Sequence, residues 1–314
     1  MDVPLISICI TCYNASKTIA RAIDSALSQD WQNYEIIIID DASTDGSQEI
    51  IKKIIMQYSF IRFLKNSINT GCAKSRNILI KEAKGEFIVF FDDDDTSRND
   101  RLRLQYNKII FFEKEVKSNL VCCFSSGIKI YPNGYKNPFN AVGIKDKVPN
   151  GREMADYLLF SKKDPKIFYG SGSPTCSLML RKVIFKNIGY FDESLDRQED
   201  IDFAIRFGLM GGHFTGIPEP VLTQFASYDP IKKNAKIEYQ STIKIINKHK
   251  EYLLLNKSYF YILYWTEIRF RHFAKQDLKA MIILFKLILH SPIRAIRHFI
   301  SSATKRYIHE KKMG

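Results

Sequence analysis

Four consecutive aspartates at residues 92–95 follow the apolar run FIVFF. Carboxylates this close repel one another unless a cation offsets their charge, and Mg²⁺ and Mn²⁺ prefer oxygen ligands. If the apolar run is a strand that keeps its geometry to the end, Asp92 and Asp94 project to the same side. The pattern predicts a divalent metal site. A solvated acidic turn before the next helix is the alternative interpretation.

A second acidic pair, Asp40 and Asp41, follows the run EIIII at residues 35–39. A carboxylate accepts hydrogen bonds from a nucleobase N–H or from sugar hydroxyls. The ring of Tyr13, which comes shortly after another apolar run, can stack on a base. These residues favour a nucleotide site, and a helix N-terminus, where Asp and Ser need no ligand, is the open alternative.

The elements that must position these residues alternate along the first hundred positions. The expected strands are 5–11, 35–39, 61–64 and 86–91, and the expected helices are 16–29, a stretch from 43 or 44 onward, and 71–83. Such alternation predicts an α/β fold, a Rossmann-like and mostly parallel sheet with helices on both faces. Ligands bind beyond the carboxyl ends of the strands in these sheets, where the polar residues fall.

The rest of the chain differs in character. Residues 101–125 predict a helix and a strand, 131–175 are rich in Pro, Gly, Asn and Lys, and 176–228 are mixed, with a helix at 200–209. From 232 onward the pattern is helical and basic. We therefore predict one domain at 1–230, followed by a helical tail at 231–314.

The charge follows the same division. The 314 residues include 47 Lys and Arg and 34 Asp and Glu, and residues 231–314 hold 18 of the former and five of the latter, which is the whole net charge of +13. This asymmetry predicts an anionic partner for the tail, and apolar residues at helical spacing within it favour an anionic membrane surface. Simple packing of the tail on the catalytic domain is the alternative. No apolar run reaches the ~20 residues that span a bilayer.

Five segments in order resemble family 2 glycosyltransferases with the GT-A fold. They are ICITCYN (8–14), IIIIDDASTDGS (36–47), NTGCAKSRN (69–77), FIVFFDDDD (87–95) and RQEDIDFAIRF (197–207). The resemblance covers about residues 3–228. It implies that residues 1–230 are a catalytic domain, with a nucleotide-sugar half at 1–95 and an acceptor half at 96–230. The chain departs from the family pattern at Ile10, where the family usually has proline, and at Ala42, where it usually has glycine.

The resemblance implies a role for each matching residue. Asp200 would be the catalytic base, and Glu199 and Ser173 would lie on the acceptor side. Asp94, with Asp92, would hold the metal. The donor-binding residues would be Thr11, Tyr13, Asp40, Asp41, Arg76, Asp92 and Asp93.

The implied activity is inverting transfer of a hexose, glucose or galactose favoured, from a UDP-sugar to a saccharide on undecaprenyl diphosphate, with Mn²⁺ or Mg²⁺ as cofactor. The overall build resembles enzymes of bacterial O-antigen or capsule assembly, and we expect a cytoplasmic protein, peripheral on the inner membrane. Another sugar nucleotide or acceptor remains open, as does a basic membrane- or nucleic-acid-binding protein with a silent GT-A fold. No nucleic-acid module occurs in residues 1–230, so no nucleic-acid partner is expected.

Overall fold

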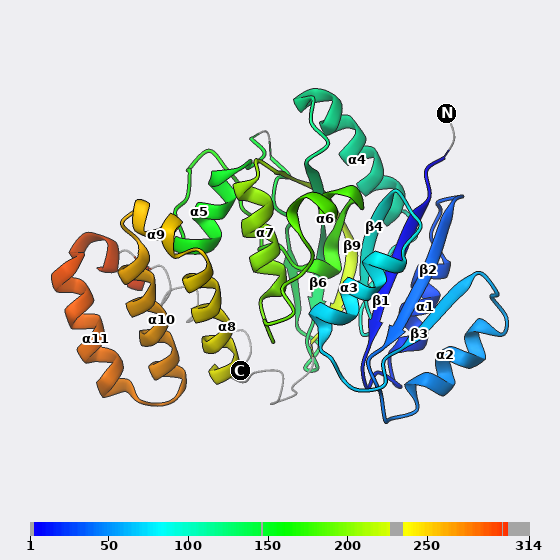
Figure 1. Ribbon diagram of the computed structural model, residues 1–314, viewed down its shortest axis with the longest axis horizontal. Helices are drawn as coiled ribbons and strands as arrows, with labels where there is room; N and C mark the ends of the chain where they lie inside the picture. The colour runs from blue at the N-terminus through cyan, green and yellow to red at the C-terminus, as the bar shows by residue number, and fades with distance from the viewer. Residues whose placement is uncertain (1–2, 146, 227–234, 297, 301–314) are drawn as a thin grey trace. The chain divides into compact units, whose positions relative to one another are not determined.

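The computed structural model describes residues 3–145, 147–226, 235–296 and 298–300 (Figure 1). The chain divides into two compact units. The first comprises Met1–Ser194 and Glu199–Ser227, and the second comprises Leu195–Gln198 and Tyr228–Gly314. The boundary predicted near Pro230 lies outside the described residues.

The described part of the first unit is built on one nine-stranded sheet with the order β3-β2-β1-β4-β8-β6-β9-β5, with β7 paired to β6. Strands β1 to β4 run parallel, as predicted, and β8 enters antiparallel between β4 and β6. The longest ladder, between β6 and β9, is parallel again. The strands are β1 (Ile6–Cys12), β2 (Tyr34–Asp40), β3 (Ile61–Lys65), β4 (Phe87–Asp92), β5 (Thr96–Ser97), β6 (Val121–Ile130), β7 (Lys136–Phe139), β8 (Leu178–Arg181) and β9 (His213–Phe225).

Helices cover both faces of this sheet, which confirms the predicted architecture (Figure 1). Alternate residues of each central strand enter different hydrophobic clusters: Ile8 and Ile10 pack with the first helix, whereas Cys9 packs with the third. Cys9 and Cys12, which have the C-x-x-C spacing of some redox and metal pairs, therefore lie on opposite faces of the sheet and do not form such a pair. The helices are α1 (Ile19–Leu27), α2 (Ser47–Ile55), α3 (Cys72–Glu82), α4 (Arg101–Val116), α5 (Arg152–Phe160), α6 (Val183–Ile188) and α7 (Glu199–Leu209), with a 3₁₀ turn η1 (Thr175–Ser177).

Two predicted helix starts are too early, and the helix expected from residue 16 begins at Ile19. The helix expected from residue 43 or 44 begins at Ser47, because the preceding polar side chains bond locally instead of capping it. The Ser43 N–H donates to Asp40 Oδ1 at 3.0 Å, and Ser43 Oγ accepts from the Asn14 N–H at 2.9 Å. Ala42 adopts a φ of 61°, a left-handed conformation in which the glycine usual at this position in the family has no steric cost.

The second unit is helical, as predicted for the tail. Its core lies between α10 and its neighbours, with Tyr261, Trp265 and Leu287 buried. No helix in the described part of the chain is long and apolar enough to cross a bilayer. The helices are α8 (Ala235–Lys248), α9 (Lys250–Leu255), α10 (Tyr259–Phe273) and α11 (Asp277–His290).

Candidate active site

The carboxyl ends of β1, β2 and β4 lie side by side in the sheet. Thr11 on β1 is in register with Asp92 on β4, and its neighbour Cys12 is in register with Asp40 on β2. The backbone N–H of Tyr13 donates to Asp93 Oδ2 at 2.9 Å, which fixes the turn after β1 against the turn after β4. The sheet therefore brings the predicted donor-binding residues to one edge, as expected from its parallel order.

Asp41 holds the loop that leads into α3. Its carboxylate accepts four hydrogen bonds of 2.7 to 3.0 Å, from the Asn66 amide, from the N–H and hydroxyl of Thr70, and from the Gly71 N–H. A carboxylate has about four acceptor positions, so these donors account for most of its capacity. In this structure Asp41 is 5% exposed. Its direct contribution is to loop geometry, and contact with a nucleobase stays a prediction.

Asp40 lies behind Asp41 and is fully buried. Its Oδ1 accepts from Gln48 Nε2 at 2.7 Å and from the Ser43 N–H. Its Oδ2 has no hydrogen-bond partner among the described residues. Through these two hydrogen bonds, Asp40 fixes the conformation of the loop that follows β2. Tyr13, by contrast, is 50% exposed and leaves its ring open to stacking.

The four aspartates do not alternate as a strand. Because β4 ends at Asp92 and the next two residues form a turn, the geometric argument for pairing Asp92 with Asp94 does not apply. Asp94 nevertheless lies close enough that its charge helps to raise the pKa of Asp92, after the larger effect of burial. The metal pair Asp92 and Asp94 stays a prediction.

A different trio comes together beside this turn. Ligand atoms of Asp92, Asp95 and Cys176 all lie within 4.8 Å of one another. Asp95 is buried, accepts from the Phe225 N–H at 3.2 Å and from Gln224 Nε2 at 3.4 Å, and has its pKa raised to about 8, by burial first and then by the charges of Asp92 and Asp94. Carboxylates whose charges act on one another in this way fit a divalent cation.

Arg76 connects this acidic group to α7. Its Nη2 donates to Asp92 Oδ1 at 3.3 Å and its Nη1 to Glu199 Oε1 at 2.5 Å, and the side chain is 7% exposed. The neighbouring Asn77 donates to the Phe191 carbonyl and to Glu193, both at 2.9 Å, so α3 is tied to the segment before α7. The expected approach of Arg76 to a nucleotide stays a prediction; its observed partners are the two carboxylates.

Asp200 lies in the first turn of α7. Burial raises its pKa to about 6, with a further contribution from Glu199, while the positive charge of Arg76 acts in the opposite direction. A carboxyl with this pKa is ionised at neutral pH and is a stronger base than an exposed aspartate. These properties suit a group that accepts a proton.

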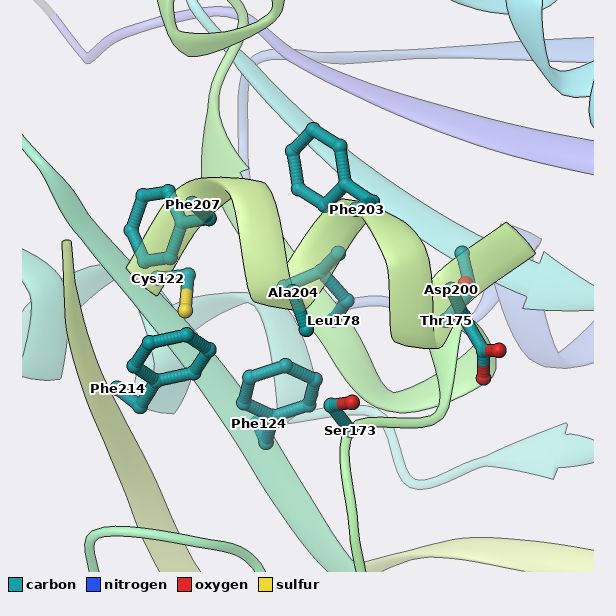
Figure 2. Close-up of a pocket in the computed structure, with 10 residues that line it drawn as sticks. All are labelled: Cys122, Phe124, Ser173, Thr175, Leu178, Asp200, Phe203, Ala204, Phe207 and Phe214. Carbon is teal, nitrogen blue, oxygen red and sulfur yellow. The ribbon is translucent and has the colours of Figure 1, made fainter. Parts of the chain in front are cut away.

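A small pocket adjoins Asp200 (Figure 2). Asp200, Thr175 and Ser173 lie at one end, and the rings of Phe207 and Phe214 lie at the other. The pocket leaves about 10 Å³ free, about enough for one water molecule. The hydroxyls of Ser173 and Thr175 are buried and have no hydrogen-bond partner among the described residues. The pocket therefore offers two hydroxyls beside a carboxylate.

Sequence reasoning missed three residues that the fold brings to the site. Asp95 was assigned no role, Cys176 lies in η1, and Gln224 lies at the end of β9, more than a hundred residues from the aspartates. The Gln224 amide bridges the other two, because it also lies 3.2 Å from Cys176 Sγ. Only Asp95, as the fourth consecutive aspartate, could have been recognised as a candidate from the sequence. The positions of Cys176 and Gln224 depend on antiparallel pairing between strands that are distant in the sequence.

Residues 7–185 match the model of the family described as Glycosyl transferase family 2. The chain belongs to this family. A solved structure of Staphylococcus aureus TarS, residues 1–349 in complex with UDP-GlcNAc, has a similar fold, with a TM-score of 0.60 at 20% identity over 92% of this chain and 82% of that one. The mixed α/β architecture is therefore the GT-A fold.

This family 2 glycosyltransferase is similar in sequence to two bacterial relatives. It is 44% identical over 107 residues to an uncharacterised glycosyltransferase of Haemophilus influenzae, covering 34% of this chain and 43% of the relative. It is 34% identical over 206 residues to Escherichia coli WfaP, named as a UDP-Glc:alpha-D-GlcNAc-diphosphoundecaprenol beta-1,3-glucosyltransferase. That match covers 66% of this chain and 70% of WfaP. Both alignments place this enzyme among bacterial glycosyltransferases.

Proposed function

We propose that this glycosyltransferase moves a hexose, glucose or galactose, from a UDP-sugar to a saccharide carried on undecaprenyl diphosphate. The observation that carries the proposal is the position of Arg76, which reaches Asp92 at 3.3 Å and Glu199 at 2.5 Å. The guanidinium of Arg76 thus joins the acidic turn to the first turn of α7, and this turn also holds Asp200. This arrangement supports a leaving-group site and a base that face the same substrate.

The donor is expected to lie along the ends of β1, β2 and β4. The half-exposed ring of Tyr13 is available to the uracil, with Thr11 beside it and Asp41, backed by Asp40, holding the loop below. The choice of a UDP-sugar is supported by the UDP-GlcNAc complex of TarS and by the name of WfaP. The undecaprenyl diphosphate acceptor is supported by the name of WfaP alone.

A divalent cation fits the acidic turn. We propose Asp94 and Asp92 as its ligands. Asp93 instead accepts a hydrogen bond from the Tyr13 N–H. Mn²⁺ or Mg²⁺, when bound, would supply positive charge for the diphosphate of the leaving group. Asp95 and Cys176 are close enough to Asp92 to support this ligand.

The acceptor hydroxyl must lose its proton as it attacks the anomeric carbon. A carboxylate oxygen of Asp200 would take this proton, since its raised pKa improves its basicity while it stays ionised at neutral pH. Because Glu199 is paired with Arg76, it is not proposed as a nucleophile. The acceptor oxygen is therefore expected to displace UDP in one step, with inversion at the sugar. Ser173, whose buried hydroxyl has no hydrogen-bond partner in the described part of the chain, is proposed to contact the acceptor.

The wider setting follows from the same proposal. Transfer to a lipid-linked saccharide belongs to assembly of an O-antigen or capsule repeat unit, and it places the enzyme on the cytoplasmic face of the inner membrane as a peripheral protein. In domain terms, residues 1–95 would bind the nucleotide sugar, 96–230 would bind the acceptor and hold the base, and 231–314 would contact the membrane.

The test is direct transfer by the purified full chain with Mn²⁺. UDP-glucose, UDP-galactose and UDP-N-acetylglucosamine are each offered with an N-acetylglucosamine diphosphate lipid, and products are identified by mass spectrometry. We expect a single added hexose that depends on the acceptor and is lost in Asp200→Asn. Transfer of N-acetylglucosamine alone would overturn the choice of sugar. Failure of all UDP-sugars to bind or react would overturn the proposed donor class.

A further inference from the structure

Helix α11 exposes large apolar side chains along one side. The exposed residues are spaced by three, four and seven positions, which places them on one stripe of a helix. Their exposed fractions range from 51% to 73%. The stripe consists of Leu278, Met281, Ile282, Phe285 and Leu289.

The opposite side of α11 already forms the core of the second unit. Ala280 and Leu287, seven residues apart, are both buried, and α10 lies alongside them (Figure 1). Trp265 of α10 is also buried, with its ring stacked 3.9 Å from the ring of His298. The exposed stripe is therefore not needed to hold the unit together, and Trp265 is not part of it.

The same pattern continues after α11. Ile293, Ile296 and Ile300 are exposed, at 68%, 48% and 58%, whereas Ala295 between them is fully buried. The amphipathic pattern of the tail thus continues through the described residues 291–296 and 298–300. A row of apolar side chains this long exceeds the scattered exposed residues normal for a soluble surface.

Basic residues flank the stripe. Lys279 and Lys286 are exposed and, being seven residues apart, lie on one side of α11 next to Ile282. Lys275 is exposed just before the helix. Residues 231–314 carry the whole net charge of +13. A partner for this surface must offer apolar contact and negative charge together.

A second copy of the chain does not meet this requirement, because its own tail would bring the same positive charge to the contact. Acyl chains beneath anionic headgroups do meet it. The 14 residues of α11 extend about 21 Å, less than the ~30 Å hydrocarbon core, so a helix of this kind lies along the bilayer surface instead of crossing it.

We propose that the stripe of α11 is the surface by which this enzyme lies on an anionic phospholipid bilayer, with Lys279 and Lys286 at the headgroups. The proposal deepens the proposed function, since it rests on an acceptor that is itself anchored in that bilayer. It also makes the interaction local: α11 binds lipid, whereas the buried aromatic residues of α10 do not.

Vesicle co-sedimentation of the full chain tests this surface without any turnover. Wild-type protein should pellet with vesicles of phosphatidylglycerol and phosphatidylcholine, and much less with phosphatidylcholine alone or at high salt. The double variant Met281→Ser/Phe285→Ser should lose at least ~10-fold in partitioning. Lys279→Glu/Lys286→Glu should lose binding to the anionic vesicles. Phe111→Ser, at an equally exposed residue of α4 in the first unit, is the matched control and should bind normally.

The result that overturns the proposal is normal partitioning of Met281→Ser/Phe285→Ser with unchanged circular dichroism and thermal unfolding. Wild-type protein that sediments as a dimer and ignores vesicles would overturn it in favour of a second copy. Assays with a short-chain, water-soluble acceptor separate this proposal from the proposed function. If the surface is right, the serine variant keeps wild-type turnover on that acceptor and loses it on vesicle-embedded acceptor. If the proposed function is wrong, neither the wild-type protein nor any variant turns over the acceptor. Vesicle binding still differs between the wild-type protein and the serine variant in that case.

Discussion

Arg76 on α3 and Glu199 on α7 form an ion pair in which Nη1 and Oε1 lie 2.5 Å apart, and the same guanidinium reaches Asp92. Residues 123 positions apart in the chain are thereby fixed across the site. Asp200 follows Glu199 directly, and the charge of Arg76 limits the rise in the pKa of Asp200 that burial and Glu199 cause. Arg76 therefore affects both the acidic turn and the proposed base.

Replacing Arg76 by glutamine removes this charge from a mostly buried position. We expect a loss of about 3 kcal/mol in the free energy of unfolding, because Glu199 and Asp92 lose their counter-charge. We also expect the pKa of Asp200 to rise further, so the acid limb of kcat/KM moves to higher pH. Arg76→Lys keeps the charge but not the two-armed geometry, and should show the smaller pH shift. An unchanged pH profile in Arg76→Gln would contradict this role.

The pH dependence of the wild-type enzyme should report Asp200. A base must be ionised, so kcat/KM should be constant well above pH 6 and fall about tenfold per pH unit below the pKa of about 6. In Asp200→Asn the rate should drop by about 10²- to 10⁴-fold and lose this acid limb, while UDP affinity measured by calorimetry stays the same. A variant with wild-type rate would remove Asp200 from the reaction.

Metal removal should stop transfer. Chelation with EDTA is expected to abolish turnover and added Mn²⁺ to restore it, and Asp94→Ala should raise the Mn²⁺ concentration needed by at least ~10-fold. Cys176→Ser is the informative control, since its sulfur lies within 4.8 Å of carboxylate oxygens of the trio. Hard cations prefer oxygen, so this variant should leave the Mn²⁺ requirement nearly unchanged. Full activity in EDTA would refute a metal requirement.

Asp41→Asn should destabilise the fold. The Asn amide offers one acceptor oxygen in place of two, and its NH₂ group faces an N–H donor of the loop at 66–71. We expect a loss of about 2 kcal/mol, seen as a lower midpoint in thermal unfolding. Asp24→Asn, at an exposed position of α1, should change stability by less than about 0.5 kcal/mol. Equal midpoints for the two variants would show that the four hydrogen bonds contribute little.

Ser173→Ala separates acceptor binding from folding. The Ser173 hydroxyl has no partner among the described residues, so its removal should not lower the thermal midpoint. If the hydroxyl contacts the acceptor, KM for the acceptor should rise while KM for the UDP-sugar stays constant. Ser125→Ala removes another buried hydroxyl without a partner among the described residues, outside the pocket lining, and should change neither constant. An unaltered acceptor KM in Ser173→Ala would exclude the contact.

Strands β1 to β4 of the first unit were predictable because each is a short apolar run that ends in polar residues. Strand β2, expected at 35–39, occupies Tyr34–Asp40, and β4, expected at 86–91, occupies Phe87–Asp92. Their parallel order followed from the alternation with helices. The insertion of β8 antiparallel between β4 and β6 was not predictable, because it depends on pairing between distant segments.

The site shows the same limit. The sequence allowed three aspartates to be placed, because Asp40 and Asp92 end strands and Asp41 follows one directly. The partners of Arg76 could not, because local spacing carries no information about a contact between α3 and α7. The expected alternation of Asp92 and Asp94 failed for a local reason: the chain turns at the end of β4 and brings Asp95 inward instead.

The end of β9 has a practical consequence for anyone who shortens this protein. The backbone N–H of Phe225 and the amide of Gln224 donate to Asp95, and they come only three and four residues before the second unit resumes at Tyr228. Residues 195–198, grouped with that unit, directly precede Glu199. A truncation meant to isolate the first unit must therefore keep every residue up to and including Phe225. A chain that ends a few positions earlier lacks the hydrogen bonds to Asp95. The resulting loss of activity would be mistaken for a need for the tail.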